Sequence, residues 1–204
     1  MDHFFQNIQG WFGCKNLYKQ VVDQACDGDH FVEIGAYRGC STAYMAVEIE
    51  KSHKNIQFDV IDNWGISACS NDGSPYPTRD WERVYLDFKR NINPVKNYVD
   101  VYRTISGRAA GCYEKGSLDF VYIDGCHCYN CAKRDIRRYL PKMKPSGIIA
   151  GDDFMSSFPG VMMAVKETFK TYRVEGRIWS VQGSGLTNVW AYRQNRQWKS
   201  KLFI

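Results

Sequence analysis

The sequence predicts an α/β fold in which seven strands form one mostly parallel sheet with an antiparallel last strand, covered by helices on both faces. Short β-branched segments alternate with amphipathic helical stretches, which is the pattern of a parallel sheet built from strand–helix units. The last two predicted strands have no helical stretch between them. They must pair antiparallel, because a parallel return needs a dozen or more residues. The predicted arrangement is Rossmann-like.

The elements follow in a regular order along the chain. Predicted strands lie at residues 31–34, 58–61, 99–102, 118–123, 147–150, 172–179 and 188–192. Predicted helices lie at residues 41–49, 80–91, 131–140 and 161–169. A glycine turn follows the first strand, and Gly183-Ser-Gly185 joins the last two. No repeat or linker divides the chain, so residues 1–204 are expected to form a single domain, with residues 1–28 as an N-terminal helical cap.

The composition is that of an ordinary globular protein, with 44% hydrophobic and 24% charged residues among 204. The net charge of +5 comes from scattered basic residues, which disfavours nucleic-acid binding. No apolar run approaches the roughly 20 residues of a membrane span. Asp2 stands where a signal peptide needs positive charge. We therefore expect a cytoplasmic protein without membrane contact. Whether it forms a homo-oligomer is left open by the sequence.

The turn after the first strand is the first candidate ligand site. Glu33 is near the strand end, Gly35 and Gly39 follow with G-x-x-x-G spacing, and Ser41 opens the next helix. Open α/β sheets bind ligands at the carboxyl end of this strand, and a helix N-terminus favours an anionic group. The spacing differs from the G-x-G-x-x-G of dinucleotide sites, which argues against an NAD-dependent oxidoreductase. It suits a ligand with an ammonium and a carboxylate, such as a methionine moiety.

Asp62 adds a nucleoside to this prediction. It ends the second strand, in the place where dinucleotide sites carry an acid roughly 20 residues beyond their glycines to bind the ribose diol. Asp62 alone could equally stabilise a turn. Together with the turn that begins at Glu33, it favours a nucleoside cofactor. The antiparallel end of the sheet is typical of class I methyltransferases, whose cofactor is S-adenosylmethionine.

Two stretches resemble known O-methyltransferases. The run Glu-Ile-Gly-Ala-Tyr-Arg-Gly-Cys-Ser from Glu33 to Ser41 is similar to the first motif of catechol O-methyltransferase-type enzymes. The stretch from Leu118 to Asp153 resembles macrocin-type bacterial O-methyltransferases. The resemblance extends from about residue 30 to residue 193 and implies a class I S-adenosylmethionine-dependent methyltransferase.

The resemblance also implies roles for individual residues. Ser41 would hold the carboxylate of the cofactor, Asp62 its ribose hydroxyls, and Ser106 would lie near the adenine. Asp124 is counted among the cofactor contacts as well. The assignment of Ser106 rests on this resemblance alone.

Three carboxylates predicted to meet at one sheet edge form a candidate metal site. Asp124 follows the fourth strand, and Asp152 and Asp153 follow the fifth. Parallel strands end at the same edge, and three like charges so close are costly without a cation. Oxygen ligands suit Mg²⁺ or another hard divalent cation, which could activate an acceptor hydroxyl. Any one acid alone could instead cap a turn; the related O-methyltransferases place their metal ligands at these three positions.

His127 is the candidate catalytic residue. It lies three residues after Asp124, where the catechol enzymes carry a catalytic lysine, and histidine accepts a proton near neutral pH. A role as a fourth metal ligand, or neither role, stays open. In the bacterial relatives this run usually reads Asp-Gly-Asp-His, and the second acid can be the base. Here that acid is replaced by Cys126, so either His127 suffices or the chemistry is weakened.

Three of the eight cysteines, Cys126, Cys128 and Cys131, surround His127. Structural zinc sites usually pair two C-x-x-C units, and only one is present here. The sequence therefore favours cysteines that replace other residues of the family, as reduced thiols, over a zinc or iron–sulfur site.

Together these observations predict an S-adenosylmethionine-dependent, divalent-metal-assisted O-methyltransferase. Its partner would be a small hydroxylated acceptor, a sugar or a natural-product-like phenol. The alternative is a non-catalytic S-adenosylmethionine-binding partner or sensor protein, which the loss of the acid at Cys126 supports. Residues 64–81 are predicted to form a lid insertion, although their aromatic residues could equally pack against the sheet.

Overall fold

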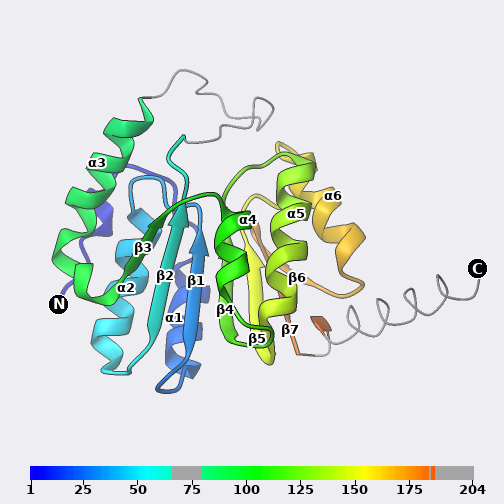
Figure 1. Ribbon diagram of the computed structural model, residues 1–204, viewed down its shortest axis with the longest axis horizontal. Helices are drawn as coiled ribbons and strands as arrows, with labels where there is room; N and C mark the ends of the chain where they lie inside the picture. The colour runs from blue at the N-terminus through cyan, green and yellow to red at the C-terminus, as the bar shows by residue number, and fades with distance from the viewer. Residues whose placement is uncertain (66–79, 184, 187–204) are drawn as a thin grey trace, which may run out of the picture.

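The computed structural model describes residues 1–65, 80–183 and 185–186, which form one seven-stranded sheet flanked by helices (Figure 1). The sheet has the order β3-β2-β1-β4-β5-β7-β6. Its strands are β1 (His30–Ile34), β2 (Gln57–Asp62), β3 (Asp100–Arg103), β4 (Leu118–Ile123), β5 (Met143–Gly151), β6 (Arg173–Glu175) and β7 (Ile178–Gln182). The first five are parallel to one another, as predicted. The direction of chain progression reverses between β1 and β4, which places a ligand crevice at the carboxyl ends of these strands.

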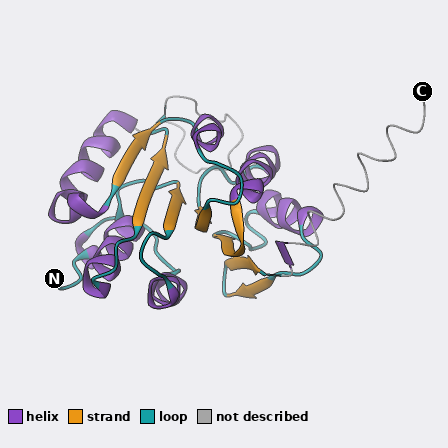
Figure 2. Ribbon diagram, turned by 60° about the horizontal axis from the view of Figure 1, so that its bottom comes forward, coloured by secondary structure: helices purple, strands orange, loops and turns teal. Residues whose placement is uncertain are grey.

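Within the described ranges, six α-helices cover the two faces of the sheet (Figure 2). They are α1 (Lys15–Gln24), α2 (Cys40–Ser52), α3 (Trp81–Ile92), α4 (Ser106–Ala109), α5 (Tyr129–Tyr139) and α6 (Pro159–Thr168). Helices α1 and α2 lie behind the sheet in the view of Figure 1, and α4 and α5 lie in front of it. Short 3₁₀ turns complete the connections at Phe5–Asn7, Asn93–Tyr98, Ala110–Cys112 and Leu140–Lys142. No helix in the described ranges is long and apolar enough to cross a membrane.

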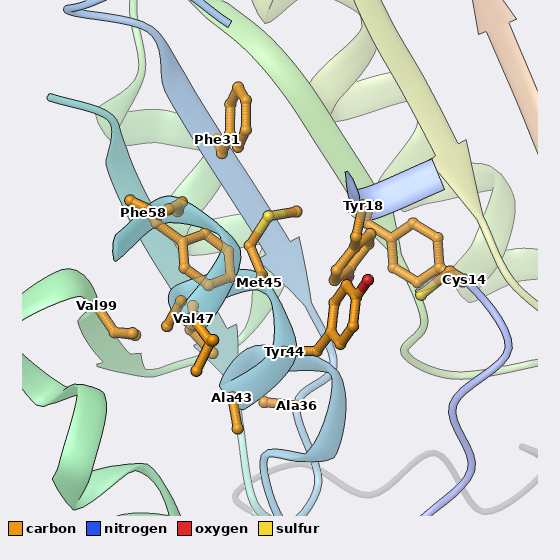
Figure 3. Close-up of a cluster of buried hydrophobic side chains, with 14 of the residues drawn as sticks. Cys14, Tyr18, Phe31, Ala36, Ala43, Tyr44, Met45, Val47, Phe58 and Val99 are labelled. Carbon is orange, nitrogen blue, oxygen red and sulfur yellow. The ribbon is translucent and has the colours of Figure 1, made fainter. Parts of the chain in front are cut away.

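The core is split into two layers because successive strand residues point to opposite faces. Phe31 of β1 packs with α1, α2 and α3 on one face, whereas Val32 packs with α4, α5 and α6 on the other. Figure 3 shows Met45 and Val47 of α2 against Phe58 of β2 in the first layer. Strands buried on both faces need apolar residues at nearly every position, which is why the central strands appear in the sequence as continuous apolar runs.

The end of the sheet differs from the prediction. The expected strand at 172–179 is wrong as a single element, because a turn at Gly176-Arg177 divides it into β6 and β7. Gly176 has a φ of 60°, a left-handed conformation that lets the chain reverse within two residues. β7 pairs antiparallel with both β5 and β6, so the antiparallel closing strand is confirmed at an earlier position. The expected strand at 188–192 lies outside the described residues, as does most of the expected lid at 64–81.

Candidate active site

The glycine turn joins β1 to α2 at the carboxyl edge of the sheet. Gly35 has a φ of 91°, and a Cβ atom added to it would lie 1.9 Å from the backbone carbonyl oxygen of Asp124. Gly39 caps α2 with a φ of 85°, and its added Cβ would meet Ile92 at 2.9 Å. Both positions therefore require glycine, for conformation and for space. The close approach at Gly35 brings the ends of β1 and β4 together.

Glu33 is buried beneath this turn and is held by hydroxyl groups. Tyr18 donates a hydrogen bond to it over 2.9 Å, and Ser41 and Thr42 also donate to the carboxylate. Burial raises the pKa of Glu33 to about 6, although the three hydroxyl donors act in the opposite direction. In this structure Glu33 connects α1, β1 and α2, and its predicted contact with a cofactor stays a prediction. Sequence reasoning missed Tyr18 and Thr42, since neither belongs to a motif.

The raised pKa of Glu33 makes a testable prediction about stability. A carboxyl whose pKa is 4.5 when exposed and about 6 when folded favours the folded state in its protonated form. Its contribution is complete below pH 4.5 and disappears as the pH rises through 6, at a cost of about 2 kcal/mol. Urea unfolding at several pH values should show that wild type loses this stability relative to Glu33→Gln. A difference between the two proteins that does not change with pH would contradict it.

Asp62, at the end of β2, supports the backbone of the same turn. Its carboxylate accepts hydrogen bonds from the N–H groups of Ala36 at 2.9 Å, Tyr37 at 3.0 Å and Trp64 at 2.8 Å. A carboxylate has about four acceptor sites, so most of its capacity is used within the turn. The structure thus shows the turn-stabilising role directly. A role toward a ribose would have to share or replace these bonds, and it stays a prediction.

Ser106 lies at the start of α4, just beyond β3. Its hydroxyl donates to the buried carboxylate of Asp135 over 2.7 Å, and its carbonyl oxygen accepts from Tyr139 at 3.0 Å. These bonds attach α4 to α5. The residue is therefore placed at the predicted edge of the sheet, with its hydroxyl engaged by α5; its predicted proximity to an adenine is not tested by this geometry.

Beyond β4 and β5, the structure brings together two carboxylates and an imidazole. Donor atoms of Asp124, His127 and Asp153 all lie within 4.8 Å of one another. The His127 Nε2 atom is 2.7 Å from Asp153 Oδ2, and His127 Nδ1 is buried without a hydrogen-bond partner in the described part of the chain. Asp153 has a φ of 64°, a left-handed conformation that turns its side chain into this group.

Asp152 lies beside this group, but its carboxylate is engaged by other side chains. Arg177 donates to its carboxylate from Nε, and the Tyr122 hydroxyl donates over 3.3 Å. Arg177 Nη2 also lies 2.8 Å from Asp153 Oδ1, an ion pair outside hydrogen-bond geometry. The structure thus places His127 among the convergent donors, and a metal-ligand role for Asp152 stays a prediction. Arg177 was not foreseen, because it lies in the β6–β7 turn that the sequence pattern concealed.

The electrostatics of this edge favour a positive charge. Burial, together with repulsion from Asp152 and Asp153, raises the pKa of Asp124 well above its usual range, and Arg177 only partly offsets this. Two carboxylates and one imidazole are ligands that divalent cations accept. The buried, unpartnered Nδ1 of His127 and the excess of acids fit such an ion, so the residues present are compatible with a metal site.

Comparison with known proteins identifies the family. Residues 32–154, more than half of the chain, match the family model described as a methyltransferase domain. The chain belongs to this methyltransferase family. The match begins within β1 and ends just after Asp153, so it includes the glycine turn and all the convergent donors.

Solved structures of methyltransferases share the fold of this methyltransferase. The O-methyltransferase NovP aligns with a TM-score of 0.61 and 17% identity, covering 83% of this chain and 78% of NovP. The calicheamicin methyltransferase CalS11 aligns with a TM-score of 0.60 and 13% identity, covering 82% of this chain and 76% of CalS11. A SAM-dependent O-methyltransferase from Thermotoga maritima aligns with a TM-score of 0.56 and 10% identity, covering 86% of this chain and 67% of that protein. At such identities the likeness shows the fold. No curated protein matches the chain.

The predicted class is thereby confirmed. The chain is a class I S-adenosylmethionine-dependent methyltransferase, with the sheet order and the antiparallel β7 that the class I fold requires. The glycine turn of Gly35 and Gly39 stands where open α/β sheets bind ligands. The acceptor and the metal are not part of this identification.

Proposed function

We propose that this methyltransferase transfers its methyl group to an oxygen of a small hydroxylated acceptor, with the help of a divalent cation. The observation that carries the proposal is the convergence of Asp124, His127 and Asp153 within 4.8 Å, at the sheet edge that also holds the glycine turn. The choice of oxygen draws support from its structural neighbours, among them CalS11, which is described as a TDP-rhamnose 3'-O-methyltransferase. A sugar or a natural-product-like phenol is the acceptor class we favour.

The cofactor would lie across the glycine turn. The free N–H groups and the positive dipole end of α2, next to Ser41, suit the carboxylate of a methionine moiety. Because Gly35 has no side chain, the cofactor could approach the backbone of the turn closely. Asp62, at the end of β2, would contact the ribose, and Ser106, just beyond β3, would lie near the adenine. A cofactor bound in this way would direct its sulfonium group toward the carboxylates of Asp124 and Asp153.

The reaction at the acceptor would depend on that acidic group. A bound divalent cation would supply Lewis-acid chemistry that lowers the pKa of the acceptor hydroxyl. Asp124 and Asp153 would hold it. The position of His127 Nε2 beside Asp153 supports a place for His127 in the same donor set rather than as an isolated base. Arg177 would orient Asp153 from the opposite oxygen. With Cys126 in place of a second acid, positioning of the two reactants would supply much of the rate.

Removal of metal should separate cofactor binding from transfer. We expect calorimetry to show S-adenosylmethionine binding with or without Mg²⁺. Transfer of a labelled methyl group to a panel of phenols and sugars should be lost in EDTA and restored by excess Mg²⁺. Transfer that persists in EDTA would contradict the proposed role of the metal but not the methyl transfer itself. Cofactor binding with no transfer to any acceptor at any metal concentration would favour a non-catalytic binding protein instead.

A further inference from the structure

Three cysteines meet where the loop after β4 enters α5. The Sγ atoms of Cys126, Cys128 and Cys131 all lie within 4.8 Å of one another, with Cys131 buried and the other two half-buried. The proposed methyl transfer uses none of them. We propose that these three thiols form a second metal site, selective for a thiophilic divalent ion of the zinc type.

This proposal departs from the expectation drawn from spacing alone. A single C-x-x-C is a weak signal because a linear pattern does not say where Cys126 points. In the structure, Cys128 is the N-cap residue of α5 and Cys131 lies in its first turn. The chain before the cap curves so that Cys126 joins them, which makes a three-sulfur group from one segment of six residues.

Backbone and side-chain donors surround the three sulfurs. The Cys131 N–H donates to Cys128 Sγ over 3.4 Å, and the Cys128 N–H donates to Cys126 Sγ. Arg134 also hydrogen-bonds to the Cys131 side chain. Burial raises the pKa of the Cys126 and Cys131 thiols above their usual range, and the N–H donor at Cys126 and the charge of Arg134 near Cys131 act in the opposite direction.

The geometry needs little change to accept an ion. Sulfurs bound at about 2.3 Å to one tetrahedral Zn²⁺ lie about 3.8 Å apart, a distance that small side-chain rotations can reach from the present one. Three thiolates leave a fourth position for solvent. Thiolates select soft ions and carboxylates select hard ones, so this site and the acidic group at Asp124 would bind different metals.

The backbone of this loop is firmly held. A Cβ atom added to Gly160, in the first turn of α6, would lie 2.5 Å from the Tyr129 nitrogen and 2.7 Å from the His127 carbonyl oxygen. Helix α6 therefore packs directly against the loop. Because His127 lies between Cys126 and Cys128, an ion bound to the sulfurs would also restrain the residue that faces Asp153.

The test is a cadmium titration of the reduced, metal-free full-length protein. Cd²⁺ bound to thiolates absorbs in the ultraviolet, so the band reports this site independently of methyl transfer. We expect saturation at one equivalent, displacement by Zn²⁺ and no competition from excess Mg²⁺. Cys126→Ser and Cys131→Ser should each weaken binding about 10-fold or more, since even residues that only orient metal ligands cost about that much.

Matched variants keep the test decisive. Cys112→Ser removes an exposed thiol outside the cluster and should leave the titration unchanged, and Asp153→Asn should leave it unchanged as well. Circular dichroism verifies that each variant is folded. A missing band, a band of equal strength in Cys131→Ser, or a Cys128–Cys131 disulfide without bound ion in freshly purified protein would each overturn the proposal.

Discussion

Replacement of Asp153 by asparagine is expected to abolish methyl transfer while cofactor binding remains. Asparagine tolerates the left-handed φ of 64° at this position and keeps the shape of the side chain, so the fold should be retained. What is lost is the negative charge that faces His127 Nε2 at 2.7 Å and contributes to the proposed metal site. Loss of the Lewis acid costs several kcal/mol, so turnover should fall on the order of 100-fold or more.

The measurement compares turnover at saturating Mg²⁺ with S-adenosylmethionine affinity by calorimetry. Asp100→Asn is the matched control, because this exposed residue begins β3 at the opposite end of the strands. Asp152→Asn distinguishes the two ligand sets: it should retain more turnover than Asp153→Asn, since Asp152 is engaged by Arg177 and Tyr122. An equal loss in both variants would restore the three-aspartate set predicted from the sequence. Equal loss of cofactor binding would make Asp153 a cofactor contact instead.

Replacement of Gly35 by alanine is expected to disrupt both the fold at the turn and cofactor binding. The added Cβ would lie 1.9 Å from the Asp124 carbonyl oxygen and 2.9 Å from the Gly125 nitrogen, and backbone atoms cannot move aside as a flexible side chain can. The left-handed φ of 91° adds a conformational penalty. Together the two effects should lower the free energy of unfolding by about 2–5 kcal/mol.

Gly28→Ala provides the comparison. Gly28 has a similar φ of 87°, but an added Cβ there would meet nothing within 4 Å, so only the conformational penalty of about 1–2 kcal/mol applies. Urea unfolding measures both losses, and calorimetry measures S-adenosylmethionine binding. If the two alanine variants lose equal stability and both bind cofactor normally, the close contact with the Asp124 backbone is not the reason that position 35 requires glycine.

Much of the fold is predictable because its signals are local. The alternation of strands and helices depends on hydrophobic periodicity, and the glycines at 35 and 39 mark backbone conformations that other residues rarely adopt. The shared edge of β4 and β5 follows from the fixed direction of parallel strands, which is why Asp124 and Asp153 were expected near each other. The turn at Gly176 was missed, since a single glycine between two short stretches of strand-forming residues is a weak signal.

Partners distant in the chain required the structure. Glu33 finds Tyr18 and Thr42 because α1 and α2 pack on the same face as its side chain. Asp152 and Asp153 are adjacent in sequence, yet one side chain is engaged by Arg177 and Tyr122 while the other turns toward His127.

The sequence by itself determined the α/β architecture, the glycine turn and the sheet edge at which acids gather, because each depends on backbone conformation and strand direction. Only the tertiary structure decided which donors meet at that edge, and that Cys126 joins Cys128 and Cys131. The physical reason is that side-chain direction at the end of a strand depends on one or two backbone dihedral angles, such as the positive φ of Asp153. Packing against α5, α6 and the β6–β7 turn selects those angles, so a local sequence pattern cannot predict them.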